Sequence, residues 1–151
     1  MTEHEGERPA PGFWEEPEPG RLVGRGHVAG DFLEAYTWDV LEKKEGLLRV
    51  GARLPAHLLN PRGELFGGFT PAYVDFMALQ TFWAGRERTP GQPWLATVNL
   101  RVDYFDPILG PDFEMIGRLV HNRGSLYWVE CQFLDPEGNL VSLGHATLKA
   151  L

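Results

Sequence analysis

The sequence predicts an α+β domain in which one antiparallel sheet curves around one buried helix. Three observations lead to this fold class. A single stretch, 69–83, is apolar on almost every face when it is drawn as a helix. Four segments with the alternation of strands follow it, and one predicted hairpin precedes it. This segregation of helix and strands along the chain is typical of the α+β class.

Length, charge and composition exclude several classes of protein. A chain of 151 residues suits one domain with a sizeable core. The net charge of −7, without a basic run, argues against a nucleic-acid partner, because phosphate contacts need clustered positive charge. The single cysteine, Cys131, excludes an internal disulfide and a multi-cysteine metal site. With no membrane-length apolar stretch and no signal-peptide pattern at the start, we expect a cytoplasmic protein without membrane contact.

Residues 1–30 are expected to form a flexible tail ahead of a single domain at 31–151. This segment is rich in proline, glycine and glutamate, a composition that disfavours a packed core. Phe13 and Trp14 interrupt its polar run. They could either anchor the tail on an apolar groove or be isolated apolar residues.

A β-hairpin is expected next. Residues 31–36 suit a short helical turn or the lead into a strand, and 37–42 alternate as a half-buried strand does. Gly46 supplies the turn before a return strand at 47–54. The Asn-Pro pair and the following glycine then predict a loop at 57–64.

The central helix is expected to begin at Thr70 and Pro71, because a proline at the start of a helix lacks only an N–H that would be unpaired there anyway. Gly85 ends it. A helix that is apolar all round is a buried one, and this one is too short to span a membrane.

The rest of the chain predicts four strands joined by turns rich in glycine, proline and asparagine. The segments are 95–105, 113–120, 126–134 and 140–148. In the first of them the apolar residues alternate at Val98, Leu100, Val102 and Tyr104.

Asp75 lies in the middle of this apolar helix. An unpaired buried carboxylate is costly, so Asp75 must have a partner or face a cleft or a subunit interface. A purely structural hydrogen-bonding role is the alternative.

Gly67 and Gly68 directly precede the helix. Backbone N–H groups at a helix start bind anions and oxyanions, and glycine lets a ligand approach closely. A tight turn with positive φ would equally account for the pair.

The run 60–68 (NPRGELFGG), together with 73–75 (YVD), resembles the signature of hotdog-fold acyl-CoA thioesterases of the phenylacetate-pathway type. The stretch 97–104 (TVNLRVDY), with Pro107 after it, resembles the long strand of that family. The similarity covers about 47–148. It implies the hotdog fold, a curved antiparallel sheet around a central helix, assembled as a homodimer or a dimer of dimers.

The resemblance also implies roles for four residues in the hydrolysis of a thioester to a carboxylic acid and a thiol. The N–H of Gly67 would bind the thioester carbonyl, and Asn60 would help to position the substrate or the water. Asp75 would act across the dimer interface as general base or nucleophile, assisted by Thr97. The substrate would be an acyl-CoA or a related thioester, with no metal and no cofactor besides the coenzyme A of the substrate.

The resemblance implies that Phe66, Gly68, Arg123 and Gly124 bind the substrate, with Arg123 near the phosphates of coenzyme A. A solvated arginine in a turn is the alternative for Arg123. Phe66 stands where the family usually has histidine, and phenylalanine cannot form the hydrogen bonds of that histidine. An alternative is therefore a non-catalytic hotdog protein that binds acyl-CoA or a similar apolar ligand. A hydratase is a weaker alternative, because no histidine closely follows Asp75.

The remaining candidates favour structural roles. His57, His121 and His145 are scattered without the spacing of a metal site. Cys131 lies in an apolar strand and is expected to act as a small hydrophobic residue.

Overall fold

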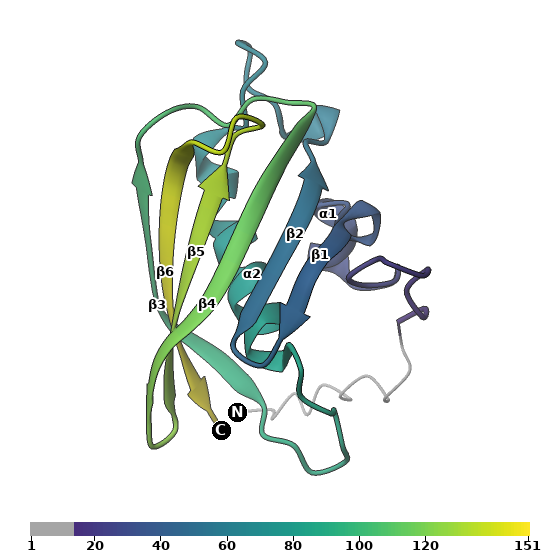
Figure 1. Ribbon diagram of the computed structural model, residues 1–151, viewed down its shortest axis with the longest axis vertical. Coiled ribbons are helices and arrows are strands. Elements are labelled where there is room, and N and C mark those ends of the chain that lie inside the picture. The colour runs from purple at the N-terminus through teal and green to yellow at the C-terminus, as the bar shows by residue number, and fades with distance from the viewer. Residues whose placement is uncertain (1–13) are drawn as a thin grey trace, which may run out of the picture.

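A computed structural model describes residues 14–151, in which six strands form one antiparallel sheet. The strand order is β1-β2-β4-β5-β6-β3, so β1 and β3 are the edges (Figure 1). The strands are β1 (Asp39–Lys44), β2 (Leu47–Arg53), β3 (Leu95–Tyr104), β4 (Asp112–Arg123), β5 (Leu126–Leu134) and β6 (Leu140–Ala150). The helices are α1 (Val28–Phe32) and α2 (Thr70–Trp83), and 3₁₀ turns occupy Ala35–Thr37, Ala56–Leu58 and Gly67–Phe69.

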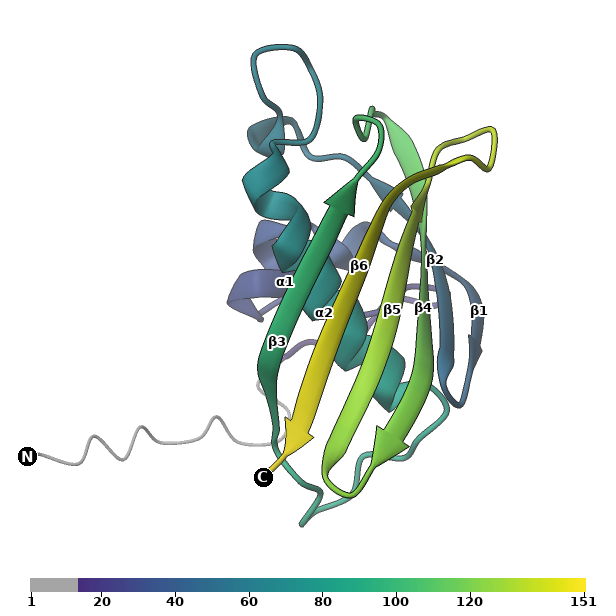
Figure 2. The ribbon, with the colours of Figure 1, turned by 90° about the vertical axis from the view of Figure 1, so that its left-hand side faces the viewer.

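Helix α2 lies along the inside of the curved sheet (Figure 2). Its side chains supply much of the core, among them the fully buried Tyr73, Val74 and Met77. The predicted α+β class, the curved sheet and the buried helix are therefore confirmed. Residues 31–36 hold the end of α1 and the start of a 3₁₀ turn rather than the lead into a strand.

Two strand glycines let α2 approach the sheet closely. A Cβ at Gly117 of β4 would collide with Oγ1 of Thr81, and a Cβ at Gly144 of β6 would collide with Cγ2 of Val74. Neither glycine has a positive φ, so the space that α2 occupies, not backbone strain, requires them. The helix side chains thus fill the places where sheet side chains would stand.

One face of α2 remains partly open in this chain, which differs from the expectation of a helix covered on every side. Ala72 is exposed, and Asp75, Leu79 and Trp83 are half-buried. Their spacing of three to four residues places them on one strip of the helix. The strip is therefore available to a substrate or to a second copy of the chain.

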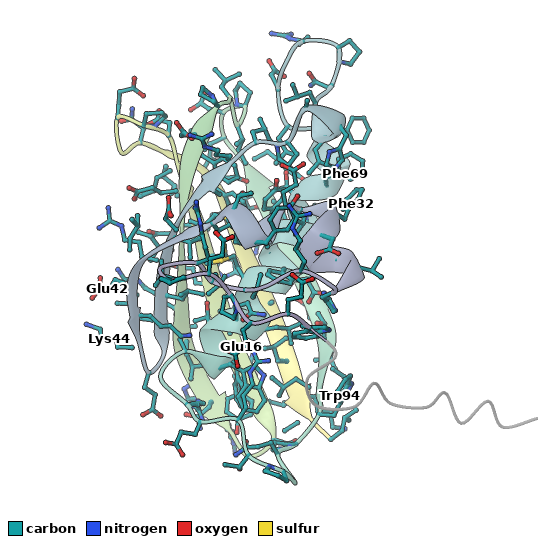
Figure 3. The ribbon with its side chains drawn as sticks, turned by 90° about the vertical axis from the view of Figure 1, so that its right-hand side faces the viewer. Glu16, Phe32, Glu42, Lys44, Phe69 and Trp94 are labelled. Carbon is teal, nitrogen blue, oxygen red and sulfur yellow. The ribbon has the colours of Figure 1, made fainter. Side chains whose placement is uncertain are left out.

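The segment ahead of residue 31 contacts the domain over its described part, 14–30. Leu22 is buried, and Arg21 pairs with Asp39 at the start of β1. Trp14 packs edge-on against His27, with ring centroids 4.7 Å apart, and Figure 3 shows this segment passing over α2. The boundary of the tail at residue 30 remains a prediction. Phe13 lies outside the described residues.

A β-bulge in β3 sets which of its side chains face α2. Thr97 pairs with Leu148, but the next pair is Asn99 with Thr147, so one extra residue is inserted at Val98. Because Leu148 is fully buried beneath α2, its neighbour Thr97 also faces the helix. The simple alternation expected for this strand is wrong at Val98, because Val98 is the inserted residue of the bulge.

Replacing either close-packed glycine should destabilise the fold. We expect Gly117→Ala and Gly144→Ala each to lower the free energy of unfolding by about 1–3 kcal/mol, because an added Cβ overpacks the helix–sheet contact. Chemical denaturation would measure the loss. Gly51→Ala in β2 is the matched control, because its Cβ would meet only Leu41, at 3.8 Å. Equal losses in all three variants would contradict this account.

Candidate active site

Asp75 and Thr97 form a hydrogen-bonded pair between α2 and β3. The Thr97 hydroxyl donates to Oδ1 of Asp75 at 2.5 Å. The bond leaves Oδ2 of Asp75 without a partner among residues 14–151. Asp75 is half-buried and Thr97 exposed, so the pair lies at the open strip of α2. The carboxylate therefore has one oxygen held and one oxygen free to accept a proton.

The glycine pair lies where the 3₁₀ turn Gly67–Phe69 leads into α2. Both glycines have negative φ, which excludes the positive-φ turn as the reason for them. A Cβ at Gly68 would lie 2.9 Å from the ring of Phe66, whereas a Cβ at Gly67 would meet only Tyr104, at 3.7 Å. Gly68 thus makes room for Phe66, and Gly67 leaves the helix start open to a ligand.

The N–H groups of Gly67 and Gly68 have no acceptor within the described chain. The following amides are engaged, because Phe69 N–H donates to the Phe66 carbonyl and Thr70 N–H to the Gly67 carbonyl. The first N–H groups of a helix carry its partial positive charge. They are suitable donors for an oxygen atom that gains negative charge.

A cavity of about 400 Å³ opens beside Gly67. It lies between the loop 60–65 and the residues that follow β3. Its lining includes Asn60, Arg62, Gly67, Tyr104 and Asp106. The cavity therefore gives a ligand access to the helix start.

Asn60 shapes the loop beside this cavity. Its side-chain oxygen accepts from the N–H groups of Arg62 and Glu64, at 2.9 and 3.0 Å, and its amide nitrogen donates to Oε2 of Glu64. These bonds occupy both ends of the side chain. In this chain Asn60 holds the loop, which places it beside Gly67 in the cavity wall.

Phe66 is the N-cap of the 3₁₀ turn and is 51% exposed. Its ring centroid lies 5.3 Å from that of Phe69, which lies 5.4 Å from that of Phe32 in α1. Figure 3 shows Phe32 and Phe69 side by side. These three rings form an apolar surface that continues from the helix start.

The two halves of the site lie apart within one chain. Eight residues of helix and 3₁₀ turn separate Gly67 from Asp75, a rise of roughly 12–14 Å. A base and an oxyanion donor that act on one carbonyl must both lie within about 3 Å of the reacting atoms. Gly67 and Asp75 of the same chain therefore cannot act on the same carbonyl group.

Arg123 and Gly124 lie at the hairpin between β4 and β5, where Gly124 has φ +57°. Arg123 pairs with Leu126, Leu126 with Lys149, and Lys149 with Ala96, so Arg123 lies on the same row of the sheet as Ala96. Ala96 is next to Thr97 in β3. The three strand spacings between them amount to about 14 Å. This hairpin is at the Asp75 end of the sheet, away from Gly67.

The histidines and the cysteine that the sequence singles out lie outside both parts of the site, the Asp75–Thr97 pair and the helix start at Gly67. The His57 ring lies 2.8 Å from the carbonyl oxygen of Phe32, and His121 packs against Trp128. Cys131 is buried. Among residues 14–151, no three His, Cys, Asp or Glu side chains gather to hold a metal ion. In the same part of the chain, no helix has the length and apolarity to cross a bilayer.

Sequence reasoning does not single out Tyr104, whose hydroxyl donates to the Gly67 carbonyl at 2.5 Å. Thr97 and Tyr104 are an odd number of residues apart, so regular alternation would put them on opposite faces. The bulge at Val98 brings both to the face of α2. Its sequence signals are its place in the stretch 97–104, which resembles the long strand of the family, and an aromatic at the end of a predicted strand, which is common in any sheet.

Comparison with known proteins establishes the fold. No protein-family model matches the chain, and no curated protein sequence matches it. Solved structures do match it: S. sahachiroi AziG is 20% identical, with a TM-score of 0.71, covering 84% of this chain and 98% of that one. The E. coli PaaI protein of the phenylacetic acid degradation operon is 13% identical, with a TM-score of 0.67 and coverages of 83% and 85%. The smu.793 protein of Streptococcus mutans, solved bound to acetyl-CoA, is 17% identical, with a TM-score of 0.66 and coverages of 76% and 89%. The chain has the hotdog fold.

Burial should make the cysteine thiol unreactive in the folded protein. Desolvation raises the pKa of Cys131 far above its ordinary value, so the thiol stays protonated at neutral pH. We expect a disulfide reagent to label no thiol in the native protein and one thiol per chain after unfolding in guanidinium. Rapid labelling of the native protein would contradict this burial.

Proposed function

We propose that this protein hydrolyses acyl-CoA or a related acyl thioester to a carboxylic acid and a free thiol. One observation carries the proposal. Asp75, held by Thr97, lies on the open strip of a buried helix whose first N–H groups are free at Gly67 and Gly68. A carboxylate with one free oxygen and a pair of oriented donors is sufficient for an activated carbonyl such as a thioester.

The residues would share the reaction as follows. Water attacks the thioester carbonyl carbon while Oδ2 of Asp75 accepts a proton from it. The carbonyl oxygen gains negative charge and accepts a hydrogen bond from Gly67 N–H. The carbon–sulfur bond then breaks, and the sulfur leaves as a thiol with the proton returned by Asp75. Thr97 keeps the carboxylate in place throughout.

A second copy of the chain would complete each site. Within residues 14–151 no strand pairs with the outer side of the edge strand β3, and an antiparallel pairing of two β3 strands would extend the sheet. With the two-fold axis near Leu100 and Arg101, Thr97 of one copy stands opposite Tyr104 of the partner subunit. Asp75 would then lie near Gly67 of the partner subunit.

The solved structures support the substrate class. The smu.793 structure contains acetyl-CoA, and a hypothetical thioesterase of Streptococcus pneumoniae was solved with coenzyme A. In the proposed dimer, the hairpin with Arg123 and Gly124 lies at the same end of the extended sheet as the start of α2 in the partner subunit. Arg123 would there contact the phosphates of coenzyme A, and Phe66 and Gly68 would contact the acyl group.

A second candidate is a protein that binds acyl-CoA without hydrolysing it. Phe66 favours this candidate, because an exposed phenylalanine beside the helix start adds apolar surface and no hydrogen bond. The two candidates differ in whether Asp75 matters for turnover, and thiol release distinguishes them.

Asp75→Asn should abolish hydrolysis and preserve the fold. Asparagine can still accept the Thr97 hydrogen bond through its oxygen, but it cannot take a proton from water. We expect kcat to fall by about 10²–10⁴, measured as thiol release from short, medium, long and aromatic acyl-CoAs. The buried Cys131 does not interfere with this assay.

Asp112→Asn, at an exposed carboxylate of β4, is the control and should keep full activity. Unchanged turnover in Asp75→Asn would exclude the aspartate as the base. Binding of acyl-CoA by the wild type without any turnover would favour the non-catalytic candidate.

Leu100→Lys should convert the dimer into an inactive monomer. Leu100 is 37% exposed and adjoins the proposed two-fold axis, so the substitution would place two like charges at neighbouring positions of the paired strands. Light scattering should report a monomer, and thiol release should fall to the level of Asp75→Asn. Val120→Lys, on a strand inside the sheet, should leave mass and turnover unchanged. An active monomer would contradict the shared site.

A further inference from the structure

We propose that Tyr104 is a positioning residue that holds the Gly67 peptides in the orientation that binds an oxyanion. This inference rests on the proposed function, because it concerns the same helix start. The observation behind it is the hydrogen bond from the Tyr104 hydroxyl to the Gly67 carbonyl oxygen, 2.5 Å long, which joins the end of β3 to the start of α2.

Gly67 needs such a restraint more than another residue would. Glycine has the widest backbone freedom, and the two peptides on either side of its Cα set where its N–H points. The Phe66 carbonyl accepts from Phe69 N–H at 2.9 Å. The Gly67 carbonyl accepts from Thr70 N–H and from Tyr104. Both peptides that flank Gly67 are therefore tethered, and among residues 14–151 Tyr104 forms the only side-chain hydrogen bond to them.

Tyr104 contributes little to the fold apart from this bond. Its side chain is 54% exposed and lines the open cavity next to Asn60 and Gly67. Its Cε1 lies 3.7 Å from where a Cβ of Gly67 would stand, so the ring lies directly beside Gly67. An exposed aromatic at a strand end carries little packing energy, so its removal should affect the helix start and not the core.

The bond also acts on the neighbouring donor. The Gly67 carbonyl belongs to the same peptide as the Gly68 N–H. A hydrogen bond accepted by the carbonyl polarises that peptide and makes its N–H a stronger donor. Tyr104 would therefore orient the N–H of Gly67 and strengthen that of Gly68, without itself contacting the thioester.

Tyr104→Phe tests this role because it removes the hydroxyl and keeps the ring. We expect kcat for thiol release to fall roughly five- to tenfold, the effect of losing one neutral hydrogen bond, while KM stays unchanged and the melting temperature falls by no more than about 5 °C. Tyr127→Phe is the matched control. Its ring packs on Phe82, its hydroxyl donates no hydrogen bond within residues 14–151, and its kcat should equal that of the wild type.

A second measurement does not depend on turnover. In wild-type protein labelled with carbon-13, the carbonyl carbon of Gly67 should resonate at higher frequency than in Tyr104→Phe, because accepting the hydrogen bond deshields it. An unchanged carbonyl shift would overturn the inference, as would a rise in KM alone, which would make Tyr104 a substrate contact. If the wild type hydrolyses no thioester, the proposed function fails, and the carbonyl shift still decides whether Tyr104 holds Gly67.

Discussion

The close contact between α2 and the sheet is the constraint on which the rest of this structure depends. Gly117 and Gly144 lack the side chains that would hold the helix away, so Thr81 and Val74 reach the sheet backbone. At this depth Asp75 stands level with β3 and meets Thr97. A helix held farther from the sheet would leave this carboxylate without its hydrogen bond.

Strand β3 then ties the start and the middle of the helix to one edge of the sheet. Its first half holds Asp75 through Thr97, and its last residue holds Gly67 through Tyr104. The bulge at Val98 makes this possible by turning both side chains to the same face. Since β3 is also an edge of the sheet formed by residues 14–151, the strand that aligns the two half-sites is the one through which a second chain would join them.

Much of this architecture is predictable from the sequence because it depends on local patterns. Continuous apolarity predicts the buried helix, alternation and turn glycines predict the strands, and the cost of an isolated buried carboxylate predicts a partner or an opening for Asp75. Two features depend on one inserted residue, Val98: the Thr97 side chain points toward α2, and the Tyr104 hydroxyl reaches Gly67. The pattern of apolar residues does not reveal this insertion. The packing of residues 14–30 on the domain likewise depends on a few contacts, such as Trp14 with His27, within a composition that is typical of a tail.

Mixing two inactive variants shows whether each site takes Asp75 from one chain and Gly67 from another. Asp75→Asn lacks the base. Gly67→Pro lacks the N–H, and Phe66 already has a conformation that suits the residue before a proline, with φ −59° and ψ 123°. If the account is right, unfolding and refolding an equal mixture should restore about a quarter of the wild-type activity, because half of the dimers then contain one intact site. A mixture as inactive as its two components would contradict it.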